Sequence, residues 1–74
     1  TEQRRLATLL AQVLDELSIE LRAVFVLYEL EDFTMAEIAS ALELPPGTVA
    51  SRLRRGREAF ERLATQALAG GELP

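Results

Sequence analysis

Residues 34–57 read TMAEIASALELPPGTVASRLRRGR, and this stretch decides how the chain folds. Thr34 followed three residues later by Glu37 is the pattern of a capping box, in which each side chain bonds to the backbone N–H of the other residue at a helix start. The pattern predicts a short helix over about residues 35–42.

A second helix start follows the Pro45-Pro46-Gly47 turn. Proline stops the preceding helix, and Thr48 is expected to cap a longer helix over about residues 48–68. A short helix, a tight turn and a longer helix form the arrangement by which a helix-turn-helix places its second helix in the DNA major groove. We therefore expect a helix-turn-helix over about residues 34–62.

The residues before this stretch carry two further helical patterns. Leucine and valine recur at three- and four-residue steps over about residues 2–16, which predicts an amphipathic helix. Ser18 then offers a cap for a helix over about residues 19–31. No segment alternates with a period of two, so the predicted fold class is all-α: one four-helix domain over residues 1–74, with a C-terminal helix-turn-helix and no winged element.

The helix expected over residues 19–31 is apolar nearly all round. Such a helix either lies at the centre of a bundle or keeps one face for a partner, and a chain of this length has little material with which to cover both faces. We therefore predict a partner-docking strip on one face. Its residues are Ala23, Val26, Leu27 and Leu30.

The composition excludes several classes of function. The chain has no Cys and no His, which removes disulfides, thiolate or imidazole metal sites and histidine-activated nucleophiles. The carboxylate pair Glu31-Asp32 falls where a turn is expected, so we expect no catalytic site, no metal, no cofactor and no enzyme. No apolar run approaches the roughly 18 residues that span a bilayer, so we expect a cytoplasmic protein with no membrane partner.

Charge is segregated along the chain. The 12 acidic and 8 basic residues give a net charge of −4, yet residues 1–47 hold three arginines against nine acids, and residues 48–74 hold five arginines against three acids. Salt screens exposed charges beyond about 8 Å at physiological ionic strength. A local arginine cluster can therefore attract phosphate although the chain as a whole is acidic.

The phase of the last predicted helix sorts its arginines by direction. At about 100° per residue its small and apolar side chains form one inward stripe, made of Val49, Leu53, Gly56 and Phe60. Ser51, Arg54 and Arg55 then face outwards. Arg52 and Arg57 lie on the flanks, where a docked helix meets phosphates rather than base edges.

Two details of the same helix bear on this prediction. Free N–H groups expected at Thr48 and Val49 would add a phosphate-binding feature at the helix start. Glutamates four residues from the arginines offer the alternative of an ordinary solvated face, through the pairs Arg54–Glu58, Arg57–Glu61 and Glu58–Arg62. The preceding capped helix and turn favour the DNA interpretation, because a solvated face requires neither.

Taken together, these motifs resemble region 4 of bacterial sigma-70-family factors, with the extracytoplasmic-function (ECF) group the nearest. The resemblance covers about residues 10–64 and is carried by Leu21-Arg22, Val24-Phe25, Leu27 and residues 34–39, 44–49, 51–53 and 55–57. It implies a domain that binds the minus-35 promoter element through its helix-turn-helix and docks on the beta-subunit flap of RNA polymerase. An anti-sigma factor is a further partner that it suggests, and the site of action would be the nucleoid in the cytoplasm.

The resemblance also assigns roles to single residues. It places four side chains close to DNA: Thr48, Ser51, Arg54 and Arg55. Arg52 and Arg57 fall at positions with supporting or phosphate-binding roles, and Thr34 lies near the DNA backbone. This chain departs from the family at three places. It has Ala50 where the family commonly has Lys or Arg, and Glu43 where the family commonly has Gly, and it lacks a Pro that the family often has near Ser18 or Ile19.

Two alternatives from other classes stay open on the sequence. A helix-turn-helix of the response-regulator or quorum-sensing type would share the core of residues 37–39 and the helix start at Thr48, but would more often lack Pro-Pro-Gly. A protein-interaction module that has lost DNA contact is favoured by the acidic first half and by Ala50.

Overall fold

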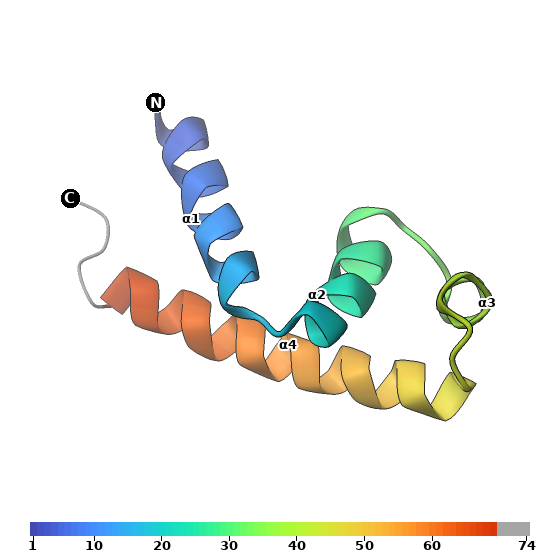
Figure 1. The fold of residues 1–74 in the computed structure, drawn as a ribbon. Coiled ribbons are helices and arrows are strands. Elements are labelled where there is room, and N and C mark those ends of the chain that lie inside the picture. The colour runs from blue at the N-terminus through green and yellow to red at the C-terminus, as the bar shows by residue number, and fades with distance from the viewer. Residues whose placement is uncertain (70–74) are drawn as a thin grey trace.

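Four helices follow one another along the chain in the computed structural model, which describes residues 1–69. They are α1 (Glu2–Glu16), α2 (Ile19–Phe25) continued by the π-helical turn η1 (Val26–Leu30), α3 (Met35–Leu42) and α4 (Pro46–Ala69). The longest helix, α4, runs the length of the molecule, and α1, α2 and α3 each pack against it (Figure 1). The predicted all-α, four-helix fold is confirmed.

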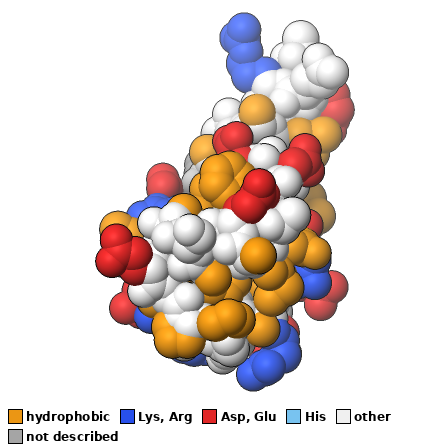
Figure 2. Space-filling view, turned by 90° about the vertical axis from the view of Figure 1, so that its right-hand side faces the viewer, with side chains coloured by type: hydrophobic (Ala, Val, Ile, Leu, Met, Phe, Trp, Pro, Cys, Tyr) orange, Lys and Arg blue, Asp and Glu red, His pale blue; other side chains and the backbone are white. Residues whose placement is uncertain are grey.

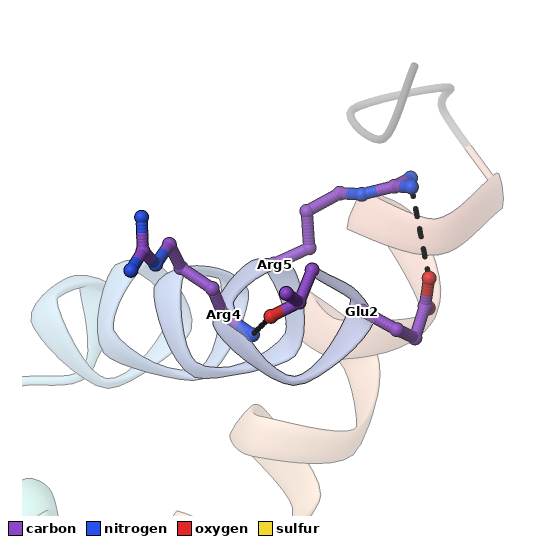
Figure 3. Close-up of polar contacts among 4 residues, drawn as sticks. Glu2, Arg4 and Arg5 are labelled. Carbon is purple, nitrogen blue, oxygen red and sulfur yellow. Dashed lines mark hydrogen bonds and ion pairs between the residues drawn. The ribbon is translucent and has the colours of Figure 1, made fainter.

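Side-chain oxygens define where α1 and α2 begin. Thr1 Oγ1 accepts a hydrogen bond from the Arg4 backbone N–H at 3.2 Å, and Arg5 pairs with Glu2 at 3.6 Å in the same turn (Figure 3). Ser18 Oγ accepts from the Leu21 backbone N–H at 3.3 Å, as the sequence predicts. Both caps satisfy donors that a helix start leaves without an intrahelical partner.

The capping box of α3 is confirmed in both of its hydrogen bonds. The Glu37 backbone N–H donates to Thr34 Oγ1 at 3.1 Å, and the Thr34 backbone N–H donates to Glu37 Oε1 at 2.8 Å. This reciprocal pair fixes the start of α3 at Met35.

The predicted start of the last helix is wrong by two residues, because α4 begins at Pro46 rather than after a Thr48 cap. Proline suits the first helical position, since its φ is already helical and it has no N–H to leave unbonded. The Pro45 carbonyl accepts hydrogen bonds from the backbone N–H groups of Thr48 at 3.0 Å and Val49 at 3.2 Å. These two N–H groups were expected to be free, and that expectation is wrong.

The last turn of the α2 segment is π-helical, which the sequence does not predict. The Glu31 backbone N–H donates to the Val26 carbonyl at 3.1 Å, a step of five residues instead of four, and the segment ends at Leu30. Such a turn carries one more residue than an α-helical turn and is often found at functional sites.

The core lies where α2, α3 and the first half of α4 meet. It is built on Val24, Ile38, Val49 and Leu53, each at most 5% exposed. The predicted phase of α4 is confirmed, since Val49, Leu53 and Gly56 are buried while Arg54 and Arg55 are exposed. Phe60, also expected in the core, is half-buried and stacks on Phe25 with ring centroids 4.8 Å apart.

We expect Glu43→Gly to stabilise the domain, because Glu43 ends α3 in the left-handed conformation, with φ 56° and ψ 49°. A side chain in this conformation costs about 1 to 2 kcal/mol. Glycine avoids this cost, but the greater conformational freedom that it gives the unfolded chain offsets part of the gain. A net gain of about 0.5 to 1 kcal/mol corresponds to a rise in Tm of roughly 2 to 8 °C. Thermal unfolding followed by circular dichroism measures it. Glu43→Ala is the control, since it removes the charge but keeps the Cβ; an equal gain in that variant would show that the charge, not the backbone, is responsible.

Candidate nucleic-acid interface

The outer face of the first half of α4 presents two arginines to solvent. Arg54 and Arg55 are exposed, on the side opposite Val49 and Leu53, and Ser51 between them and the helix start is half-buried. In the part of the chain that the structure describes, neither arginine has a carboxylate within ion-pair distance. Their guanidinium groups are therefore available to an external anion.

The two flank arginines of α4 are instead held by the α2–η1 segment. Arg52 Nη2 lies 4.0 Å from Glu20 Oε2, and the Arg52 side chain is 25% exposed. Arg57 Nε donates to Glu29 Oε2 at 2.5 Å. Because Glu20 lies in the first turn of α2 and Glu29 lies in η1, the two ends of one segment reach opposite flanks of α4.

The within-helix pairs that would make α4 an ordinary solvated face are not formed. Among residues 1–69, no ion pair joins Arg54 to Glu58, Arg57 to Glu61 or Arg62 to Glu58. The outward face keeps Glu58 as an exposed acid beside the two free arginines.

The two remaining predicted DNA-binding residues lie at the starts of α3 and α4. Thr48 is half-buried in the first turn of α4. Thr34 is exposed, and its oxygen already accepts from Glu37, which leaves its O–H as a donor. Seen from the α3 end of the molecule, hydrophobic and acidic side chains share the face and basic side chains appear at its rim (Figure 2).

Residues 7–60 match the protein-family model described as Sigma-70, region 4. The chain belongs to this family. The match covers most of the chain, from α1 into the second half of α4, and no curated protein and no solved structure gave a match. Membership implies a DNA-binding domain that recognises the minus-35 promoter element within a sigma factor, and that has no enzymatic activity.

The match decides between the two families of helix-turn-helix that the sequence leaves open. The matched range, residues 7–60, includes all of α2, η1 and α3 and the part of α4 up to Phe60. The response-regulator alternative is therefore not supported.

The predicted docking strip lies on the surface of the region 4 domain, on α2 and η1. Ala23, Val26 and Leu27 are half-buried, and Leu30 is 47% exposed. The first three line an open hollow with Arg22 and Ile19, and Ile19 is 72% exposed. Ile19 was not among the predicted strip residues, although its spacing of four and seven residues from Ala23 and Val26 places it on the same helix face.

Residues 1–69 contain neither a metal-binding cluster nor a membrane-spanning helix. No cluster of Asp and Glu side chains is placed to hold a metal ion. We also find no helix with the length and hydrophobicity that a membrane span requires.

Proposed function

We propose that this region 4 domain belongs to an alternative sigma factor of the ECF type, and that it directs transcription initiation by reading the minus-35 element while docked on the beta flap of RNA polymerase. The observation that carries the proposal is the phase of α4. Its buried side, at Val49 and Leu53, turns Arg54 and Arg55 outwards without a carboxylate partner in residues 1–69. A helix with two free arginines on one face suits the major groove.

The proposed contacts divide into base-reading and phosphate-binding groups. Arg54 and Arg55, with Ser51 beside them, would meet base edges, where a forked arginine reads guanine. Thr34 and Thr48 would lie against the backbone. Arg52 and Arg57, which sit on the flanks beside Glu20 and Glu29, would meet the phosphates on either side of the groove.

The proposed docking surface is the strip of Ala23, Val26, Leu27 and Leu30, extended by Ile19. Ile19 and Leu30 are exposed and the other three are half-buried, and an apolar surface of this kind suits a hydrophobic partner. An anti-sigma factor would compete for the domain. Because the chain carries a net charge of −4 and roughly four to six phosphate contacts are available to it, the isolated domain should bind its promoter weakly. Tethering to polymerase would make that weak contact effectively intramolecular.

Arg55→Ala should weaken binding to the preferred promoter more than binding to random duplex, whereas Arg57→Ala should weaken both about equally. Base contacts discriminate between sequences and phosphate contacts do not. One forked arginine on guanine contributes about 1 to 3 kcal/mol of discrimination. The preferred duplex is first selected from a randomised pool, and fluorescence anisotropy then gives both affinities at a fixed salt concentration. Equal losses on both duplexes for Arg55→Ala would refute its base-reading role.

A second candidate is a domain that binds polymerase without reading DNA, and Ala50 favours it. This residue is exposed on the recognition helix, where related domains commonly carry a basic side chain, and exposed Glu58 lies on the outer face. The two candidates differ in one measurement, because only the first requires a preferred sequence to emerge from the randomised duplex pool.

A further inference from the structure

Arg57 contacts two neighbouring residues of η1, one through a charged hydrogen bond and the other through an aromatic ring. Arg57 Nε donates to Glu29 Oε2 at 2.5 Å, and the centre of the guanidinium lies 5.3 Å from the centroid of the Tyr28 ring. The carboxylate accepts a hydrogen bond from one edge of the guanidinium, and the face of the Tyr28 ring attracts its positive charge. Two neighbouring residues of the π-helical turn thus contact the same arginine head group.

The atoms used in this contact leave the rest of the guanidinium free. The hydrogen bond to Glu29 is made through Nε, and within residues 1–69 neither terminal nitrogen of Arg57 donates a hydrogen bond. The Arg57 side chain is still 53% exposed. Arg52 differs, because its single contact is made by a terminal nitrogen, at 4.0 Å, and its side chain is only 25% exposed.

We propose that Glu29 is a positioning residue for DNA binding, which holds Arg57 through Nε so that its two terminal nitrogens are presented to a phosphate on one wall of the groove. The inference rests on the proposed DNA-binding function. A long, flexible arginine loses rotamer freedom when it binds, and a side chain that is already held in the free protein loses less. An acid on a DNA-binding surface would then strengthen binding, which is the opposite of what its charge alone predicts.

The test measures affinity for a random duplex by fluorescence anisotropy over a range of low salt concentrations. The variants are Glu29→Ala, Glu29→Gln, Arg57→Ala and the double variant Glu29→Ala/Arg57→Ala. The matched control is Glu31→Ala. Glu31 is an exposed acid two residues from Glu29, and it has no ion pair in residues 1–69, so its replacement removes the same charge without removing a contact. Circular dichroism checks that each variant is folded.

Glu29→Ala is expected to weaken binding about threefold or more, which is the effect of about 0.7 kcal/mol, although it removes a negative charge. Glu29→Gln should restore most of the affinity, since the amide oxygen can accept from Nε–H. Arg57→Ala should lower the salt dependence by about one phosphate contact, and adding Glu29→Ala to it should cost nothing further. Glu31→Ala should bind as tightly as the parent chain or slightly more tightly.

Two other results have distinct meanings. If Glu29→Ala binds more tightly, to the same extent as Glu31→Ala, Glu29 acts only through its charge and the positioning role is overturned. If the parent chain binds no duplex at low salt while it is folded, the proposed DNA-binding function is contradicted, and this inference with it. The Arg57 Nε–H resonance gives an independent measure, since it should lose its distinct shift in Glu29→Ala and keep it in Glu29→Gln.

Discussion

Val26→Asp is expected to abolish promoter-directed transcription by a sigma factor that carries this domain, while the domain stays folded and its intrinsic DNA affinity stays unchanged. Val26 lies in the middle of the docking strip, half-buried against its neighbours and open to the surface hollow that Ile19 and Ala23 also line. A carboxylate buried there without a partner would cost the complex more than the free domain, which can still hydrate it. Loss of the tether lowers the effective affinity for the promoter by about 10²- to 10⁴-fold.

The measurement is transcription in vitro with core polymerase and a promoter that carries the selected minus-35 sequence. Ile19→Asp is the second variant, because Ile19 is 72% exposed and its replacement leaves the core untouched. Leu6→Asp is the control, since it places the same charge on an apolar side chain that is 49% exposed on α1, outside the strip. Full transcription by both strip variants would show that polymerase docks elsewhere.

Nanomolar promoter binding by the isolated chain at physiological salt would also contradict the tethering argument, because polymerase would then have little affinity to add.

The sequence was sufficient for those parts of the fold that local chemistry decides. The starts at Ser18 and Thr34 follow from a side-chain oxygen three residues before the N–H that it accepts from, and the buried face of α4 follows from the spacing of Val49 and Leu53. The start of α4 was misplaced because Thr48 is a good cap and Pro46 an equally good first residue, and sequence alone did not rank the two.

Contacts between residues that are far apart in the chain could not be predicted from the sequence. The sequence offered pairs within α4 only as an alternative to DNA contact and did not indicate the pairs that form, in which Arg57 contacts Glu29, 28 residues away, and Arg52 contacts Glu20. Those pairings depend on the angle at which α2 crosses α4 and on the extra residue of the π-helical turn, neither of which has a local sequence signal. The sequence therefore predicted where Arg52 and Arg57 lie on the helix, but not which carboxylates they contact.

Gly56→Leu is expected to prevent stable folding, because Gly56 lies at the crossing of α2 and α4. A Cβ placed on Gly56 would lie 3.3 Å from the Leu21 carbonyl oxygen and 3.5 Å from the Phe25 Cβ. The Leu21 carbonyl is part of the α2 backbone and cannot move independently of the helix, so a larger side chain at Gly56 must displace α2 as a whole. Overpacking of this kind costs about 1 to 3 kcal/mol or more, and a domain below about 80 residues rarely has more than about 3 to 5 kcal/mol.

The matched pair Gly56→Ala and Gly47→Ala separates crowding from helix propensity. Both glycines lie within α4, but a Cβ on Gly47 would have no atom within 4 Å. Gly47→Ala should therefore gain about 0.5 to 1 kcal/mol from propensity, whereas Gly56→Ala should gain nothing or lose stability, as measured by urea denaturation followed by circular dichroism. An equal gain at both positions would mean that α2 and α4 do not approach as closely as described. The close approach matters for function, because the α2–η1 segment carries the docking strip on one side and, through Glu20 and Glu29, contacts both flanks of the DNA-facing helix on the other. Separating the two helices would disturb both surfaces at once.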